Sequence, residues 1–448
     1  MEEDEVEMEK KRIIEKCKEE SYQTEDNPNE RNFGWGTKLL NFKDTLKINL
    51  INFNSNFTPQ ISSIHIFYKI YNPLTKKGIQ SYNNEIGKLL IITYRSNYKK
   101  QINPNTKEEY TSDCGWGCMI RSSQMIMARL IYKIFKYKYK NQLNSMNILK
   151  SIIPFFMDNN IYVKDIKNTS EYNFVKITIN NYYKKLEQFL EEEKKIKGDN
   201  LSIISFDPPF SIHKICRIGE IYGRSCGEWF SDYNLPMIFS KINNTFDIIP
   251  DLNIFHFNSD LAMNEVLAEC FTKIKNIDNS MSQNDYFQNE KMEKFLFKKM
   301  GAIFISVRLG LLSIPSEYYP SIKKLFECKQ FIGIIGGKMN SASYFFGYCD
   351  DDMLYLDPHF NQESITKLDM KNISSYLDKK VYKLHITNLQ CAFTIGFLFR
   401  NLNEFKTLYC FMKMIILDKF PCFHVHFEKY YIDKQKIQIA VDNEKNDF

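Results

Sequence analysis

A helical pattern of apolar side chains begins just after Cys118. Residues three, four and seven apart share one face of a helix, so this run predicts an amphipathic helix with Cys118 in or beside its first turn. Gly115 and Gly117 come immediately before it and permit a sharp entry into the helix. The apolar positions that set the pattern are Ile120, Met127, Leu130, Ile131 and Ile134.

Strand patterns follow in the second half of the chain. Runs rich in β-branched and aromatic residues, bounded by turn residues, predict strands at 302–308, 344–348, 353–356 and 392–399. Highly charged runs predict two further, exposed helices at 7–20 and 184–197. A helix that precedes a set of strands indicates an α+β fold.

Length and composition set the expected domain organisation. With 448 residues, 44% of them hydrophobic, the chain buries a large core, and length alone permits two or three domains. We expect a charged, disordered N-terminal tail at 1–40, a folded body at 41–430 and a C-terminal tail at 431–448. Within the body, low-complexity Asn/Lys-rich segments near 139–200 and 275–294 read as insertions.

Cysteine usage and the N-terminus point to a cytoplasmic protein. The eleven cysteines are scattered through apolar segments without paired zinc-ligand spacing, as expected of reduced thiols, so no metal and no cofactor is predicted. The N-terminal twenty residues are too charged for a signal peptide, and no apolar run reaches the length of a membrane span.

The net charge of +6 does not argue for a nucleic-acid partner. The lysine-aromatic run at 132–140 has two readings. It is either a surface for an anionic partner such as lipid, or the solvated face of a helix whose aromatic residues are buried. We favour the helix and expect no nucleic-acid binding.

Cys118 is a candidate nucleophile. A helix N-terminus carries roughly half a positive charge, which favours a thiolate over a thiol. The alternative is a structural cysteine, since unpaired cysteines are among the most often buried residues. Position alone does not separate the two.

Asp357 and His359 supply candidate partners for the thiol. Side chains at i and i+2 of an extended segment share a face, and Pro358 biases Asp357 towards extended geometry. A carboxylate beside an imidazole fixes its tautomer and leaves the other ring nitrogen for a thiol. The alternative is a surface turn with an incidental histidine, but the chain has only seven histidines and a glycine-flanked cysteine to pair with.

Five blocks in one order resemble the autophagins, the autophagy cysteine proteases that mature and recycle a ubiquitin-like modifier. The blocks are TSDCGWGCMIRSSQM, DPPFSIHKICRIGEIYGRSCGEWF, VRLGLLSIPSEYYPSIKKLF, IGIIGGKMNSASYFFGYCDDDMLYLDPHF and LQCAFTIGFLFRNLNEF. The resemblance implies a papain-like cysteine protease fold, whose small additional subdomain comes from the block around 208–229.

The resemblance also implies roles for individual residues. Cys118 matches the nucleophile, His359 the general base and acid, and Asp357 the residue that orients the histidine. Tyr94 matches a tyrosine beside the oxyanion site, and Trp229 a tryptophan that covers the channel to the nucleophile. The mobile gate over that channel corresponds to Gly336, Gly337, Lys338, Met339, Asn340, Ser341 and Ala342.

The chain departs from the family pattern at three positions. Met339 stands where the gate usually carries a proline, so the stiffness of the gate differs. Ser343 stands where a histidine is common. Cys114 is an additional thiol, either a resolving cysteine for Cys118 or a small residue in a turn.

The implied function is cleavage after a C-terminal glycine of the autophagy ubiquitin-like modifier. It covers both the precursor and the conjugate with phosphatidylethanolamine, with transient membrane contact through the substrate. Two alternatives belong to other classes: a noncatalytic modifier-binding protein, and a redox or metal protein that uses Cys114 and Cys118.

Overall fold

The computed structural model describes residues 56–159, 176–177, 180–188, 207–273, 295–338, 341–366 and 370–426. The predicted helix at 7–20, the predicted insertion at 275–294 and the tail at 431–448 lie outside these residues. So do the predicted N-terminal tail at 1–40 and, within the predicted insertion at 139–200, residues 160–175, 178–179 and 189–200. Of the helix predicted at 184–197, the described part is helical, in a segment at 180–188.

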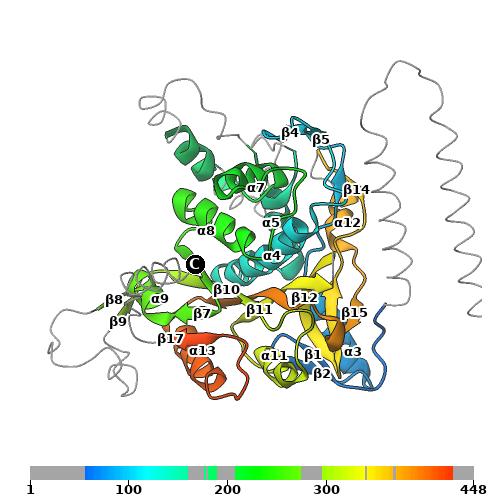
Figure 1. Cartoon of the computed structure of the whole chain (residues 1–448), viewed down its shortest axis with the longest axis vertical. Helices are drawn as coiled ribbons and strands as arrows, with labels where there is room; N and C mark the ends of the chain where they lie inside the picture. The colour runs from blue at the N-terminus through cyan, green and yellow to red at the C-terminus, as the bar shows by residue number, and fades with distance from the viewer. Residues whose placement is uncertain are drawn as a thin grey trace, which may run out of the picture. The chain divides into compact units, whose positions relative to one another are not determined.

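Within the described residues, a nine-stranded sheet forms the centre of the fold, with the main order β15-β13-β12-β11-β16-β10-β6 (Figure 1). Strand β1 pairs with β12 and also with β2. All pairs are antiparallel except β10 with β6. The strands are β1 (Ile64–Ile66), β2 (Lys69–Tyr71), β6 (Leu252–Asn258), β10 (Met300–Arg308), β11 (Phe331–Lys338), β12 (Ser341–Cys349), β13 (Asp352–Leu356), β15 (Tyr382–His385) and β16 (Ala392–Phe399).

The four strands expected from the sequence are therefore β10, β12, β13 and β16. Of these, β12 begins three residues earlier than expected, at Ser341, because it forms a hairpin with β11. Asp350 turns the chain between β12 and β13 with a φ of 52°. These strands are buried almost continuously, because helices cover both faces of the sheet, so their runs of β-branched and aromatic residues locate them well.

Helices cover both faces of the sheet. On one face lies α4 (Cys118–Lys138), which packs on β11 and β12, with α5 (Ser145–Ile152), α7 (Ile212–Gly219) and α8 (Asn234–Phe246) around it (Figure 1). On the other face lie α11 (Tyr319–Leu325) and α13 (Leu402–Ile415). Strand β16 shows the alternation: Gly396 faces Ile126 of α4, whereas Phe397 and Phe399 pack on aromatic rings of α13.

Helix α4 is more deeply buried than an amphipathic pattern predicts. Every side chain from Cys118 to Tyr132 is buried. The sheet covers one side of the helix, and α5 and α8 cover another, so its polar residues also face protein. Only its last turns reach solvent, where Tyr137 and Lys138 are exposed and Phe135 is buried. The lysine-aromatic run thus forms the end of this helix, with Tyr132 and Phe135 buried as expected and Tyr137 exposed against expectation.

The remaining elements frame the central layers. The helices are α3 (Lys76–Ile86), α9 (Met263–Cys270) and α12 (Met370–Leu377), with short 3-10 turns η2 (Ile153–Phe156), η4 (Glu220–Tyr222), η6 (Ser316–Tyr318) and η7 (Ile386–Asn388). Four two-stranded ladders pair β3 (Arg95–Ser96) with β14 (Gln362–Glu363), β4 (Gln101–Ile102) with β5 (Glu109–Tyr110), β7 (Asp260–Ala262) with β17 (His424–His426), and β8 (Phe271–Lys273) with β9 (Phe295–Phe297).

This mixed architecture is consistent with a papain-like cysteine protease, in which a central helix packs on a largely antiparallel sheet. The block around 208–229, from which a small subdomain was expected, contains α7, η4 and the loop that carries Trp229. No helix in the described ranges is both long and apolar enough to cross a membrane.

Candidate active site

Cys118 is the first residue of α4, as the apolar pattern predicts. Gly117 occupies the N-cap position and provides no side-chain cap, so the free N–H groups of the first turn face the region of the thiol. The side chain of Cys118 has no exposed surface. A buried thiol at a helix N-terminus is held in the partial positive field that stabilises a thiolate.

His359 and Asp357 lie in the loop that directly follows β13. The Nδ1 atom of His359 hydrogen-bonds Oδ1 of Asp357, and the backbone N–H of His359 donates to the same oxygen at 3.0 Å. Both residues are buried. The carboxylate therefore fixes the ring orientation and leaves Nε2 for the thiol of Cys118, with which His359 shares a hydrogen bond.

The electrostatics favour a thiolate–imidazolium pair. Burial alone would lower the pKa of His359, but the charge and hydrogen bond of Asp357, together with those of Cys118, raise it to about 10. Burial alone would raise the pKa of Cys118. The hydrogen bond and charge of His359, with smaller contributions from the N–H of Ala342 and the side chain of Tyr94, lower it below its ordinary value. Each group therefore favours the charged form of the other.

Tyr94 lies against both members of the pair. Its ring meets the His359 ring edge-on, with centroids 5.4 Å apart, and its hydroxyl hydrogen-bonds Cys118. Its backbone N–H donates to the carbonyl of Pro358 at 2.9 Å, which ties it to the histidine loop. Burial and the neighbouring Cys118 raise the pKa of Tyr94 well above its ordinary value, so the hydroxyl remains a proton donor.

Trp229 lies against the loop that precedes the thiol. Its indole N–H donates to the carbonyl of Gly115 at 3.2 Å, and 43% of its side chain is exposed. The indole is therefore held against the loop that leads into Cys118, and its expected role over the channel stays a prediction.

The expected gate is the hairpin between β11 and β12. Gly336 and Gly337 belong to β11, paired with Ser343 and Ala342, while Lys338 pairs with Ser341. Met339 and Asn340 lie outside the described residues, so the expected mobility of the gate stays a prediction.

This hairpin touches the reacting groups directly. The hydroxyl of Ser341 lies 3.3 Å from Nε2 of His359, and the N–H of Ala342 hydrogen-bonds the thiol of Cys118. Ser343, where the family often has histidine, is buried and pairs with Gly336.

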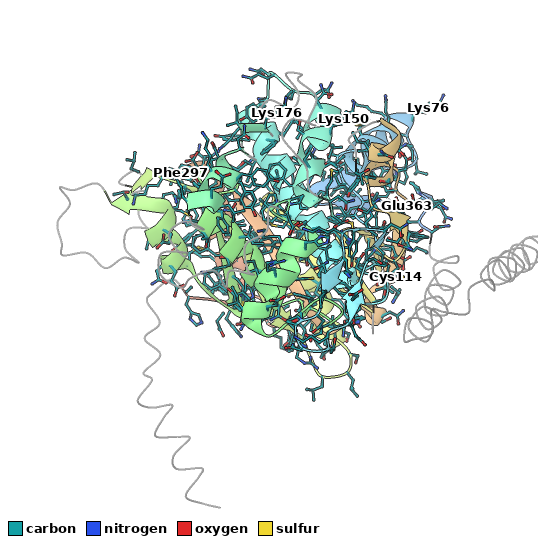
Figure 2. The ribbon with its side chains drawn as sticks, turned by 90° about the horizontal axis from the view of Figure 1, so that it is seen from above. Lys76, Cys114, Lys150, Lys176, Phe297 and Glu363 are labelled. Carbon is teal, nitrogen blue, oxygen red and sulfur yellow. The ribbon has the colours of Figure 1, made fainter. Side chains whose placement is uncertain are left out.

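Cys114 is partly exposed, and its backbone N–H donates to the hydroxyl of Ser112 at 3.2 Å. In the view of Figure 2 it lies on the same side of the molecule as Glu363 and away from Phe297. Glu363 belongs to β14, close after the histidine loop. Whether Cys114 resolves an oxidised Cys118 stays open.

Sequence reasoning missed three buried charged residues that are linked to the start of the Cys118 helix: Asp113, Arg121 and Asp158. Arg121 binds both carboxylates. Asp113 and Arg121 belong to the same sequence block as Cys118. Their charges, close to the mainly apolar first turns of the predicted helix, were the signal in the sequence that could have identified them.

Among the described residues, no group of three or more His, Cys, Asp or Glu side chains could hold a metal ion. What the site does hold is a thiol, an imidazole and a carboxylate in hydrogen-bonded series. This is the arrangement with which cysteine hydrolases attack a carbonyl carbon.

Comparison with known proteins agrees with this class. A sequence model of the peptidase C54 catalytic domain matches residues 79–410, and the chain belongs to this peptidase family. The expected autophagin membership is thereby confirmed, and the chain is a cysteine peptidase by family.

Similar proteins come from animals and fungi. A protein named cysteine protease ATG4B from Gallus gallus is 24% identical over 377 residues, covering 81% of this chain and 82% of the relative. Cysteine protease ATG4C from Xenopus laevis is 26% identical over 344 residues, covering 74% and 71%. Cysteine protease ATG4 from Candida albicans is 29% identical over 342 residues, covering 75% of this chain and 58% of the relative.

Proposed function

We propose that this chain cleaves the autophagy ubiquitin-like modifier after its C-terminal glycine, both in the extended precursor and in the conjugate with phosphatidylethanolamine. The observation that carries the proposal is the hydrogen-bonded series Cys118–His359–Asp357 at the start of a buried helix. Membership of the peptidase C54 family and the names of its relatives supply the substrate class.

In the first step, the thiolate of Cys118 attacks the carbonyl carbon of the substrate glycine and forms the C–S bond. The electron pair of the carbonyl moves to oxygen, and the hydroxyl of Tyr94 and the backbone N–H of Cys118 stabilise this oxyanion. One such donor lowers a barrier by about 3 kcal/mol. The high pKa of Tyr94 keeps its proton on the hydroxyl for this role.

In the second step, the C–N bond breaks and the proton on Nε2 of His359 passes to the leaving amine. Asp357 stabilises the imidazolium before that transfer and the correct tautomer after it. Neutral His359 then takes a proton from water, which attacks the thioester and releases the glycine carboxylate with the thiolate restored. The leaving amine is the C-terminal peptide in the precursor and intact phosphatidylethanolamine in the lipid conjugate.

The surroundings of the thiol favour glycine as the residue that is cut. Cys118 has no exposed surface, Trp229 binds the loop before it, and the N–H of Ala342 in the β11–β12 hairpin bonds its thiol, which supports a narrow approach. A residue without a side chain passes such a narrow opening in extended form and brings its carbonyl within about 3 Å of sulfur. A larger residue would clash.

An exposed apolar loop supports a protein substrate. Leu311 and Leu312, in the turn after β10, are 82% and 99% exposed. The turn begins at Leu309, whose N–H donates to the carbonyl of Cys391. The residue before Cys391, Gln390, donates its N–H to the carbonyl of Gly337 in the gate hairpin. Exposed leucines beside an active site mark a contact surface for the folded part of a modifier.

Location and membrane contact follow from the proposed substrate. A lipid-conjugated modifier lies on a membrane surface, so the enzyme acts there transiently, through the substrate, from the cytoplasm. The mechanism needs no metal or cofactor.

The test compares wild type, Cys118→Ala and Cys410→Ala on two substrates. One is the modifier with a C-terminal extension, and the other is the modifier conjugated to phosphatidylethanolamine in vesicles. Cys410 is an exposed cysteine on α13 and serves as the matched control. We expect wild type and Cys410→Ala to cut both substrates after glycine and Cys118→Ala to cut neither, with binding retained.

Other outcomes identify the alternatives. Wild-type protein that binds the modifier without cutting it is a noncatalytic binding protein. Stoichiometric metal, or a reversible disulfide between Cys114 and Cys118 without peptidase activity, indicates the redox or metal class. Cleavage of the precursor alone restricts the function to maturation.

A further inference from the structure

A buried ion pair spans the loop that leads into the nucleophile. Arg121 Nε donates to Asp113 Oδ2 at 2.7 Å, and Arg121 Nη2 donates to Asp113 Oδ1 at 3.0 Å. Neither side chain has exposed surface. Because Arg121 lies on the first turn of α4 and Asp113 precedes the loop, the pair closes a ring of residues that contains Cys118.

The backbone of this ring is bound to the same aspartate. The carbonyl of Asp113 accepts the N–H groups of Trp116 (3.2 Å) and Gly117 (2.9 Å), and Gly117 starts the helix by accepting the N–H of Arg121 at 3.0 Å. A Cβ atom at Gly117 would lie 2.3 Å from Oδ2 of Asp113. The carboxylate is thus packed against the backbone of the residue next to Cys118.

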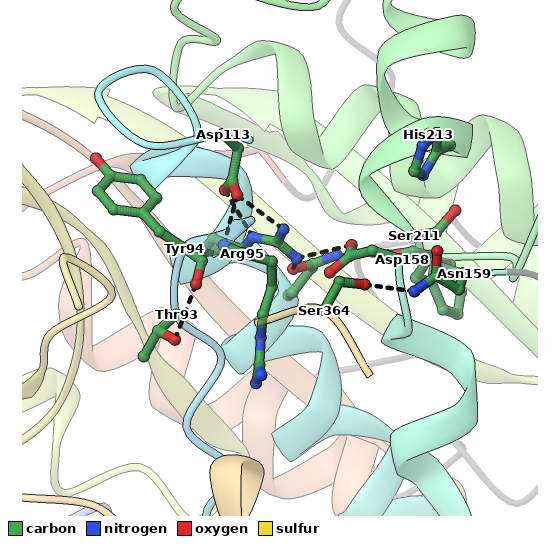
Figure 3. Close-up of polar contacts among 12 residues, drawn as sticks. Thr93, Tyr94, Arg95, Asp113, Asp158, Asn159, Ser211, His213 and Ser364 are labelled. Atoms are coloured by element: carbon green, nitrogen blue, oxygen red, sulfur yellow. Dashed lines mark hydrogen bonds and ion pairs between the residues drawn. The ribbon is translucent and has the colours of Figure 1, made fainter. Parts of the chain in front are cut away.

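The same carboxylate also holds the oxyanion side of the site. Oδ1 of Asp113 accepts the backbone N–H of Arg95 at 2.7 Å, and Arg95 directly follows Tyr94 (Figure 3). The hydroxyl of Tyr94 in turn hydrogen-bonds Cys118. One aspartate therefore sets the positions of two groups that must meet at the substrate carbonyl.

A second carboxylate stabilises the arginine from the other side. Arg121 Nη1 donates to Asp158 Oδ1 at 2.9 Å, and Asp158 is also buried. The next residue, Asn159, donates to the hydroxyl of Ser364 at 2.6 Å, close after the histidine loop (Figure 3). The two acids outweigh the effect of burial and raise the pKa of Arg121 well above its ordinary value, so the guanidinium stays charged.

We propose that Asp113 and Arg121 are positioning residues for the peptidase reaction, holding the thiol of Cys118 at the distance from Tyr94 and His359 that attack requires. They act through the backbone of the 113–117 loop and do not touch substrate. The proposal rests on the proposed function for its turnover measurements. Its second readout, the reactivity of the thiol itself, is independent of the substrate.

The competing view is that the pair contributes only stability, as any buried ion pair does when one partner is removed. The chain offers a matched control on the same helix. Arg129 of α4 binds Glu85 at 2.9 Å, is also buried, and lies about two turns beyond Arg121 and away from the loop. Loss of stability alone would affect the Arg121 and Arg129 variants alike.

The experiment compares Arg121→Lys with Arg129→Lys. Lysine keeps the positive charge but cannot form the bidentate hydrogen bonds that Arg121 makes with Asp113. Measurements are kcat and KM on the extended modifier, the pH dependence of Cys118 alkylation by iodoacetamide read by peptide mass spectrometry, and the melting temperature. We expect Arg121→Lys to lower kcat about 100-fold with little change in KM, because a displacement of about 1 Å has that effect. We also expect its alkylation profile to move to higher pH.

Arg129→Lys should keep the wild-type kcat and alkylation profile despite a lower melting temperature. Equal kcat and profiles in the two variants, after correction for the folded fraction, would overturn the proposal. If the modifier is not the substrate, turnover is absent in wild type too, whereas the alkylation profiles still distinguish the variants.

A milder variant covers the case in which Arg121→Lys does not fold. Asp158→Asn keeps Oδ1, the oxygen that accepts from Arg121. It replaces Oδ2, which has no hydrogen-bond partner in the described part of the chain. It removes one charge that holds the guanidinium. We expect a smaller loss of kcat and a smaller shift of the alkylation profile in the same direction. A wild-type profile in folded Asp158→Asn, with Arg121→Lys unfolded, would count against positioning.

Discussion

The hydroxyl of Ser341 lies 3.3 Å from Nε2 of His359, the ring nitrogen that is left for Cys118 once Asp357 binds Nδ1. The hairpin between β11 and β12 thus reaches the imidazole of His359 itself. Ser341 and the thiol of Cys118 share one ring nitrogen, so we expect the serine to compete with the thiolate for the proton on Nε2.

The first prediction concerns this shared contact. Ser341→Ala should leave Nε2 to the thiol alone, lower the pKa of Cys118 further and speed its alkylation by iodoacetamide at mildly acidic pH, by about threefold. A neutral hydrogen bond contributes about 1 kcal/mol, which allows an effect of this size. Ser343→Ala, at a buried serine two residues along β12, is the control. Slower alkylation in Ser341→Ala would show that the serine supports the pair.

The pH dependence of turnover provides the second prediction. The active form has Cys118 deprotonated and His359 protonated, so the rate should rise through the lowered pKa of the thiol and fall above about pH 10, where His359 loses its proton. Asp357→Ala removes the group that raises the pKa of His359, so the alkaline limb should move to lower pH, with turnover severely reduced. An unchanged profile in Asp357→Ala would mean that another residue holds the histidine. His359→Ala should be as damaging as loss of the thiol.

A third prediction addresses the narrow approach to the thiol. Replacing the substrate glycine by alanine should reduce turnover steeply. Trp229→Ala should lower kcat/KM about tenfold, because the extended C-terminal segment of the substrate is then held less firmly. Tyr233→Ala is a suitable control, since Tyr233 is a similarly exposed aromatic residue at the N-cap position of α8. Equal rates for glycine, alanine and valine substrates would show that no narrow channel exists.

The fourth prediction is about stability, away from the site. Burial would raise the pKa of Glu85, but Arg129 with Lys88 and Lys69 lowers it to about 2. Its ionised form therefore stabilises the fold above the ordinary carboxyl pKa, and this contribution is lost as pH falls towards 2. Glu85→Gln should lower the free energy of unfolding by about 3 kcal/mol at neutral pH, because it leaves Arg129 buried without its counter-charge. Denaturant unfolding at pH 7 and pH 3 measures this, and the difference between variant and wild type should shrink at pH 3.

Local patterns in the sequence were enough to predict the parts of the site that depend on neighbouring residues. Cys118 begins a helix because the apolar period begins there, and Asp357 reaches His359 because they lie two positions apart after a strand. The four predicted strands were found for the same reason, since a run of β-branched and aromatic residues bounded by turn residues is visible over a few positions.

Contacts between distant segments were not predictable in this way. The full burial of α4 depends on α5 and α8, whose packing against it has no local pattern. The contact between Ser341 and His359 joins separate elements of the fold, and so does the ion pair between Arg121 and Asp158. Their residue types alone are equally compatible with a solvent-exposed position.

The most direct test of the account is covalent capture of the nucleophile. The probe is the modifier in which a vinyl methyl ester replaces the carboxylate of the C-terminal glycine. It is incubated with wild type, Cys118→Ala and Cys410→Ala. Mass spectrometry then measures the mass of each product and identifies the modified residue. The account predicts one adduct per chain, on Cys118, in wild type and Cys410→Ala, and none in Cys118→Ala. An adduct on another residue, or equal labelling of Cys118→Ala, would contradict it.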